Sequence, residues 1–189
     1  MILRRFYLLI LAFSFLLQGC TKLNASVDRA ISLRQQLLSG QGCCFDASVT
    51  SDYGTEIYTF SLKCTYYANG VLDFLVLTPD SVAGIAGKID ETGAYLTVDD
   101  HALAFPMLAD NQITPVTAPW VIFRALRSGY LSACGEEDAL LRVKLDDSYE
   151  ENALEVDVWL NQENLPVHGE ILWDSRRILS VTVENFHFL

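Results

Sequence analysis

The short connections between strand-like segments restrict the fold of this chain more than any other feature. Apolar and polar residues alternate from Leu154 to Leu160, and short turn sequences separate this segment from its neighbours. The Asn69-Gly70 pair is the strongest turn signal, because both residues accept the positive φ angles of a two-residue hairpin turn. Since parallel neighbours need a crossover of about a dozen residues or more, the pattern predicts an antiparallel sheet.

Two segments have helical spacing of apolar residues. The first is Ser26 to Ser39, with Ser26 as the expected N-cap, and the second starts at Pro119 and stops at Gly129. The segments expected as strands are 43–51, 56–66, 71–78, one around Ile89, 95–98, 102–105, 139–145, 153–160, 165–173 and 178–188. The proline-rich connection 106–119 either covers the sheet or moves. We therefore expect an α+β fold, with helices on one face of a curved antiparallel sheet.

The N-terminus has the features of a bacterial lipoprotein signal. Arg4 and Arg5 precede an apolar run from Phe6 to Leu17, and Gly19 stands directly before Cys20. The run is shorter than the roughly 20 residues of a membrane span. Processing would remove residues 1–19 and leave diacylglycerol on Cys20 as the one covalent group, with no other cofactor. The alternatives are an ordinary signal peptide and an uncleaved anchor helix.

These features predict a location and a domain organisation. We expect a lipid-anchored protein on the extracytoplasmic side of the cell membrane, or of the outer membrane if the host has one. Residues 20–25 would form a lipidated tether and residues 26–189 a single domain. Without residues 1–19 the chain has 11 basic and 24 acidic residues. This charge makes nucleic acids improbable partners, and membrane attachment would depend on the acyl chains.

Four cysteines remain once Cys20 carries lipid, and an even number outside the cytoplasm suggests disulfides. If the numbers of residues opposite each other in the first hairpin sum to 107, Cys43 lies opposite Cys64. Cys44 then points to the other face of the sheet and is free to meet Cys134. Pairing of Cys44 with Cys64, and four reduced thiols, are the alternatives.

The sequence contains no recognisable catalytic or metal-binding pattern. His101, His168 and His187 lack neighbours at metal-ligand spacing, and neither a nucleophile elbow nor a phosphate loop is present. We therefore predict no catalytic residues, no metal ligands and no enzymatic activity. The aromatic side chains that could line an apolar pocket, or equally form the core, are Trp120, Phe123, Phe60 and Trp159.

Three parts of the chain together resemble a known group of proteins. They are the helix before the first strand, the segment 78–85 that starts Thr78-Pro79, and the closing strand sequences 156–167 and 181–186. On these the chain resembles the LolA/LolB-like bacterial lipoprotein family, which comprises half-barrel lipoprotein carriers and lipid-anchored relatives. The resemblance implies an incomplete β-barrel with helices packed on its concave face, an apolar cavity for acyl chains, and no catalytic residues.

Two functions follow as expectations. The first is a membrane-anchored protein that binds a lipid acyl chain or another apolar ligand in the half-barrel. The second is a non-enzymatic partner or scaffold of a cell-envelope enzyme, as implied by resemblance to clostridial germination lipoproteins that work with a cell-wall amidase. Lipidation of Cys20 argues against a freely diffusing shuttle.

Overall fold

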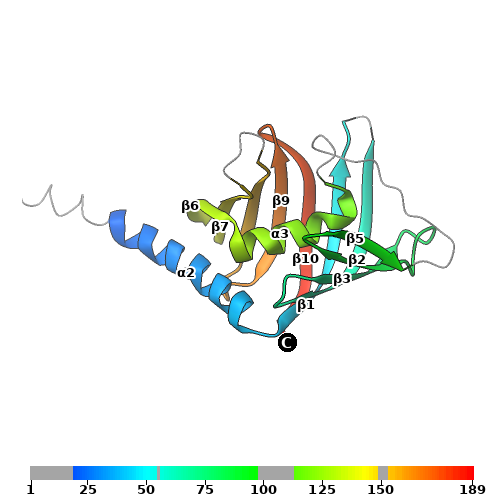
Figure 1. The fold of residues 1–189 in the computed structure, drawn as a ribbon. Coiled ribbons are helices and arrows are strands. Elements are labelled where there is room, and N and C mark those ends of the chain that lie inside the picture. Colours follow the sequence, from blue (N-terminus) through cyan, green and yellow to red (C-terminus); the bar gives the residue numbers. More distant parts are fainter. Residues whose placement is uncertain (1–18, 55, 98–112, 149–152) are drawn as a thin grey trace, which may run out of the picture.

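The computed structural model describes residues 19–54, 56–97, 113–148 and 153–189, and these form one antiparallel sheet with helices packed against it (Figure 1). The helices are α2 (Gly19–Ser39), the 3-10 helix η1 (Pro115–Thr117) and α3 (Ala118–Ser128). The strands are β1 (Gly42–Asp52), β2 (Ile57–Tyr67), β3 (Leu72–Thr78), β4 (Ala86–Asp90), β5 (Gly93–Thr97), β6 (Tyr130–Glu137), β7 (Leu140–Asp146), β8 (Glu155–Leu160), β9 (Pro166–Trp173) and β10 (Arg176–Phe188).

The sheet has the strand order β5-β4-β3-β2-β1-β10-β9-β8-β7-β6. The chain first builds a meander outward from β1 to β5, passes through α3, and returns from the opposite edge until β10 pairs with β1. Every neighbouring pair is antiparallel. The first and last strands therefore meet in the middle of the sheet, and the predicted α+β class and antiparallel arrangement are confirmed.

Helix α3 lies across the hollow of the curved, unclosed sheet (Figure 1). Its residue Phe123 is fully buried and stacks on Phe45 of β1 with ring centroids 4.3 Å apart. Alternate residues of strands such as β1 and β7 are buried, so side chains fill the space between the helix and the sheet. The sequence predicted helices on the concave face of an incomplete barrel, and this arrangement is confirmed.

The ends of helix α3 are explained by a proline in its first turn and a glycine after its last residue. Pro119 occupies the first turn, where a missing N–H costs nothing, and Gly129 follows the last residue. The carbonyl groups at the C-terminal end are bound by Arg34 of α2, whose Nε donates to the Leu126 oxygen at 2.8 Å and whose Nη2 donates to the Gly129 oxygen at 2.7 Å. A cation at this position also interacts favourably with the helix dipole. Arg34 therefore joins the two helices.

Replacing Arg34 by alanine should lower the free energy of unfolding by about 2 kcal/mol, because hydrogen bonds from a charged donor to the α3 carbonyls are lost. Urea denaturation followed by circular dichroism measures this change. The exposed neighbour Gln35 provides the control, and Gln35→Ala should change stability by less than about 0.5 kcal/mol. Equal effects of the two substitutions would show that Arg34 contributes nothing to the junction.

The Asn69-Gly70 turn connects β2 to β3, as predicted, and also contacts α3. Only Gly70 of this pair has a positive φ, because a hydrogen bond from the Tyr67 N–H to the Val71 oxygen closes a three-residue loop instead of a two-residue turn. Gly70 has a φ of +86°, and a Cβ at this position would lie 2.7 Å from the Arg127 guanidinium. The Gly70 carbonyl accepts a 2.9 Å hydrogen bond from the Trp120 indole. The positive φ favours glycine at this position, and the hydrogen bond from Trp120 makes the turn a docking point for the helix.

Two features differ from the sequence prediction. Helix α2 begins at Gly19, so Ser26 lies inside the helix and is not its N-cap, and residues 20–25 are helical. No glycine or proline interrupts the chain from Cys20 to Ser39, which explains the longer helix. Strand β6 was missed because a bulge between Leu131 and Ala133 breaks its alternation. The predicted strand 102–105 and most of the connection 106–119 lie outside the described residues.

The register of the first hairpin was also predicted incorrectly. Cys43 lies opposite Tyr66, and Cys64 lies opposite Phe45. A four-residue loop, closed by a 3.0 Å hydrogen bond from the Tyr53 N–H to the Glu56 oxygen, shifts the pairing by two residues. A shift of two residues leaves every side chain on the same face of the sheet. The predicted burial of Phe45, Ala47 and Val49 is therefore correct, although their predicted cross-strand partners are wrong.

Within the described part of the chain, no helix is both long and apolar enough to cross a membrane.

Candidate functional site

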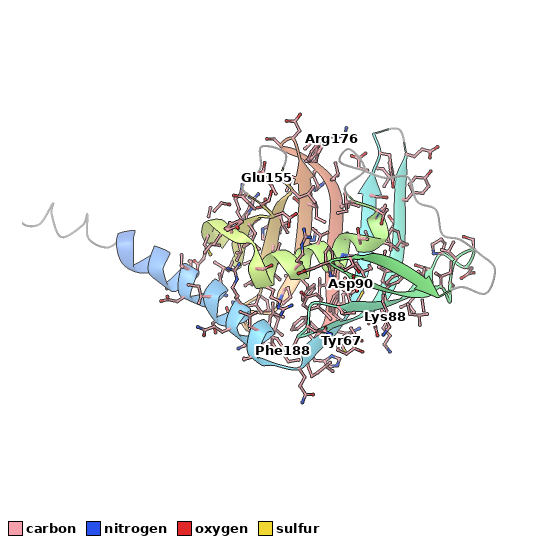
Figure 2. All side chains as sticks on the ribbon, viewed as in Figure 1. Tyr67, Lys88, Asp90, Glu155, Arg176 and Phe188 are labelled. Atoms are coloured by element: carbon pink, nitrogen blue, oxygen red, sulfur yellow. The ribbon has the colours of Figure 1, made fainter. Side chains whose placement is uncertain are left out.

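A pocket of about 520 Å³ lies between α3 and the β4–β5 hairpin. Its apolar wall consists of Ile89, Ala94, Trp120, Val121 and Leu154. All of these except Ala94 are buried, so the wall is an extension of the hydrophobic core. Asp90, labelled in Figure 2, stands on the β4–β5 side of the opening. The volume lies within the range of small-molecule sites, which are concave and mostly apolar.

Two of the charged groups of the pocket, Arg124 and Asp147, pair with each other, whereas Asp90 and Glu91 add negative charge on the β4–β5 side. Arg124 forms an ion pair with Asp147, and its guanidinium stacks over the Trp120 ring at 4.5 Å from the ring centroid. Both charged side chains are more than two-thirds buried. The Trp120 indole N–H is already bound to Gly70, so the Trp120 ring is held in one position. This wall therefore offers a fixed aromatic surface and a neutralised ion pair, which suit an apolar or amphipathic ligand.

The four aromatic residues predicted to line a cavity are placed in three different environments. Trp120 borders the pocket, whereas Phe60 and Phe123 are buried in the packed core. Phe123 contacts Phe45 and also stacks on Phe186 at 6.0 Å. The space beneath α3 is therefore filled by these rings, and the pocket lies beside the helix.

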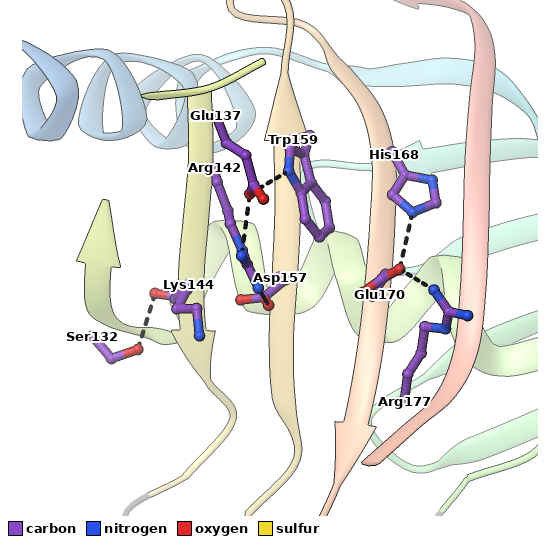
Figure 3. Close-up of polar contacts among 9 residues, drawn as sticks. All are labelled: Ser132, Glu137, Arg142, Lys144, Asp157, Trp159, His168, Glu170 and Arg177. Carbon is purple, nitrogen blue, oxygen red and sulfur yellow. Dashed lines mark hydrogen bonds and ion pairs between the residues drawn. The ribbon is translucent and has the colours of Figure 1, made fainter. Parts of the chain in front are cut away.

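Trp159 lies on the outer face of the sheet, away from the pocket (Figure 3). The Arg142 guanidinium is 4.9 Å from its ring centroid, and its indole N–H donates to Glu137 at 3.2 Å. Arg142 also binds the buried carboxylate of Asp157, and this hydrogen bond raises the pKa of Arg142. Trp159 belongs to a polar cluster and does not line the candidate ligand site.

Sequence reasoning missed most of the pocket. Thr117, Val121 and Arg124 follow helical i, i+4, i+7 spacing, and this row would have indicated that they share one side of the helical segment formed by η1 and α3. Ile89 of β4 and Leu154 before β8 reach the same pocket only through the fold. No local pattern in the sequence joins those two segments, because 64 residues separate them along the chain.

The four cysteines are free thiols in the structure. Cys43 and Cys64 are buried on the concave face, whereas the Cys44 sulfur lies 3.5 Å from the Thr65 hydroxyl on the outer face. Cys134 lies on β6, separated from β1 by β10, β9, β8 and β7, and donates to the Ser26 carbonyl of α2 at 3.3 Å. The fold therefore does not bring Cys44 to Cys134, and it places Cys44 and Cys64 on opposite faces.

Burial of the Cys43 thiol should make the free energy of unfolding decrease at alkaline pH. Desolvation raises the pKa of this thiol from 9.0 to about 12. The unfolded chain loses the thiol proton first, so the stabilisation is complete below pH 9 and declines by about 1.4 kcal/mol per pH unit between pH 9 and 12. Urea denaturation at several pH values should show a shallower decline for Cys43→Ala, whereas the control Cys44→Ala should follow the wild type. Parallel curves for all three proteins would contradict this assignment.

The described histidines have structural contacts. His168 Nε2 lies 3.5 Å from Glu170, which also accepts a 2.7 Å hydrogen bond from Arg177 (Figure 3). His187 contacts the Asn185 carbonyl at 3.0 Å. Among the residues that the structure describes, no three histidine, cysteine or acidic side chains are placed to hold a metal ion. His101 lies outside the described residues.

A scan against protein-family models finds no match, and a search of curated proteins finds no relative. Solved structures are similar in fold. A conserved uncharacterised protein from Thermus thermophilus has 13% identity and a TM-score of 0.46, over 87% of this chain and 88% of that chain. A LolA superfamily protein from Nitrosomonas europaea has 9% identity and a TM-score of 0.42, over 82% and 93%. The lipoprotein LppX from Mycobacterium tuberculosis has 13% identity and a TM-score of 0.41, over 87% and 94%.

Proposed function

We propose that this chain is a lipid-anchored extracytoplasmic protein that binds an apolar ligand, such as a lipid acyl chain, in the pocket between α3 and the β4–β5 hairpin. The observation that carries the proposal is the pocket itself, a space of about 520 Å³ with the buried side chains of Ile89, Trp120, Val121 and Leu154 in its wall. A ligand there would remove this apolar surface from water, which favours binding.

The proposed ligand site is a binding site and not a catalytic one. Asp147 is engaged by Arg124, and Arg124 rests on Trp120, so these groups hold one another in place. The ligand end that meets this ion pair would be polar, and the end that meets Val121 and Leu154 would be apolar. An amphipathic lipid satisfies both requirements.

The anchor is the second part of the proposal. Cys20 follows Gly19 at the end of the apolar run, and diacylglycerol on its sulfur would hold the acidic body at the membrane. The protein would then take up ligand close to the bilayer. Flotation of the protein with vesicles tests the anchor, because Cys20→Ser should abolish flotation.

Ligand binding is tested by filling the pocket. Ala94 is exposed and lines the pocket, so Ala94→Phe should place a ring in the ligand space without disturbing the core. We expect organic extracts of the purified Cys20→Ser chain to contain non-covalent lipid at a stoichiometry near one, measured by mass spectrometry. Ala94→Phe should reduce this amount by about fivefold, which corresponds to about 1 kcal/mol of binding free energy.

The matched control is Ala86→Phe, which adds the same ring to the other face of the sheet. Ala86 pairs with Thr97, whereas Ala94 pairs with Ile89, whose buried side chain lies on the pocket side. The Ala86→Phe protein should retain its lipid. Equal lipid contents in the two variants, or an empty Cys20→Ser parent chain, would overturn the ligand proposal.

A second candidate is a non-enzymatic anchored partner or scaffold of a cell-envelope enzyme. The packing of Phe45, Phe60 and Phe123 favours it, because among the described residues these buried rings occupy the space directly beneath α3. The same extraction experiment distinguishes the two functions. An empty wild-type protein that binds a purified cell-wall amidase stoichiometrically would favour the scaffold.

A further inference from the structure

The wall of the ligand pocket carries more acidic than basic groups. Among the described residues of the lining are three carboxylates and one guanidinium, which belong to Asp90, Glu91, Asp147 and Arg124. Arg124 is already engaged, because it pairs with Asp147 and its guanidinium stacks over Trp120. The remaining charge of the lining is therefore negative, and it lies on Asp90 and Glu91 at the β4–β5 turn.

The basic residues closest in sequence to the lining lie elsewhere. Lys88 of β4 forms a 3.5 Å ion pair with Asp73 of β3. The Arg127 guanidinium, near the end of α3, lies against the β2–β3 turn, 2.7 Å from where a Cβ on Gly70 would be. Neither Lys88 nor Arg127 is among the residues that line the pocket.

The sequence around the lining residues is also poor in cations. Residues 89–123 and 145–175 contain no lysine and no arginine, but 14 acidic residues. Apart from Arg124, every residue that lines the pocket belongs to one of these two stretches. An anionic ligand head would therefore be repelled, and to reach a guanidinium of the described lining it would have to displace Asp147 from Arg124.

The Asp90 carboxylate is fixed by its own turn and remains charged. Its Oδ1 atom accepts a 2.5 Å hydrogen bond from the Thr92 hydroxyl and a 2.7 Å hydrogen bond from the Thr92 N–H. These two donors lower the pKa of Asp90. The ion pairs formed between described residues include neither Asp90 nor Glu91. Both carboxylates therefore lack a cationic partner within the described chain.

We propose that the ligand of this pocket is an amphiphile whose polar head carries an ammonium group. Its apolar tail would cover the buried wall, and its head would meet Asp90 and Glu91 on the β4–β5 side of the opening. An ammonium head is attracted by these two carboxylates, whereas the head of a fatty acid is repelled by them. The inference rests on the ligand pocket of the proposed function and not on the anchor.

Three amphiphiles that share a twelve-carbon chain test the proposal. They are dodecyltrimethylammonium, which is cationic, dodecyldimethylamine oxide, which has no net charge at neutral pH, and laurate, which is anionic. Isothermal titration calorimetry of the delipidated Cys20→Ser chain gives the Kd of each amphiphile. A salt concentration of about 0.15 M reduces the Debye length to about 8 Å, which screens the charges of the body outside the pocket.

We expect the ammonium amphiphile to bind about fivefold more tightly than the amine oxide, and laurate to bind about fivefold more weakly, as two exposed charges allow. The double variant Asp90→Asn/Glu91→Gln should reduce the preference for ammonium to less than about twofold. Asparagine at position 90 keeps an oxygen that accepts the two Thr92 hydrogen bonds, so the turn is retained.

The matched control is Asp80→Asn/Glu163→Gln, which removes the same charge from two exposed residues outside the pocket. This control should keep the preference for ammonium, and Ala94→Phe should weaken the binding of all three amphiphiles. Equal Kd values for the three amphiphiles, or equal loss of the preference in both double variants, would overturn this inference alone. If no amphiphile binds, or if Ala94→Phe changes no Kd, the ligand pocket of the proposed function is contradicted as well.

Discussion

Replacing Phe123 by alanine should lower the free energy of unfolding by about 3 to 5 kcal/mol, the largest effect expected of a single substitution in this chain. The ring is fully buried at the centre of α3, stacked on Phe45 at 4.3 Å and close to Tyr66 at 5.6 Å. Removing it leaves a cavity that the surrounding strands cannot close, because they are held by their own ladders. Thermal and urea denaturation measure the loss.

Phe186 is the matched control for this substitution, because it carries the same side chain and stacks on Phe123 but is only partly buried. Phe186→Ala should lower the free energy of unfolding by only about 1 to 2 kcal/mol, because the Phe186 side chain buries less apolar area than the Phe123 side chain. If Phe123→Ala costs as little as Phe186→Ala, the Phe123 ring would be loosely packed and the space beneath α3 would be open to a ligand.

Replacing Arg142 by methionine should lower the free energy of unfolding by about 3 kcal/mol, because it leaves the Asp157 carboxylate buried without its cation. The Asp157 side chain is 3% exposed, and it lies opposite Glu170 in the neighbouring strand. The Arg142 guanidinium also bonds Glu137 at 3.1 Å and covers the Trp159 ring (Figure 3). Arg142 itself is partly exposed, which places the effect at the lower end of the range for buried pairs.

A double-mutant cycle separates the ion pair from the packing. Asp157→Asn removes the charge that Arg142 neutralises, so the double variant Arg142→Met/Asp157→Asn should be more stable than Arg142→Met alone. Urea denaturation of the four proteins gives the coupling free energy. A double variant that is as unstable as the sum of its parts would show that the cluster depends on Trp159 packing and not on the charges.

The strand ladder could be predicted from local pattern because each strand alternates between core and outer face. Phe45, Ala47 and Val49 of β1 were assigned to one face, and all three are buried. Their cross-strand partners were wrong by two residues, since the register depends on a loop conformation that the alternation does not encode. The same error explains why Cys43 was expected opposite Cys64.

The pocket shows where prediction from sequence stopped. Trp120 was a candidate because it is a large aromatic residue on an apolar helix, and it borders the pocket. Trp159 was a candidate for the same reason, but its strand position turns it to the outer face beside Arg142. Residue type alone does not distinguish these two cases, because the face depends on strand register and on where α3 crosses the sheet.

The sequence by itself determined the fold class, the antiparallel connections, the helix between Pro119 and Gly129 and the inward faces of the strands, because short turns and the two periodicities act locally. It also predicts the lipid anchor at Cys20. Only the tertiary structure decided that β1 and β10 meet in the centre of the sheet, that Phe123 fills the half-barrel, and that Ile89 and Leu154 meet at one pocket. These features depend on contacts between residues far apart in the chain, which are set only when the helices pack into the curved sheet.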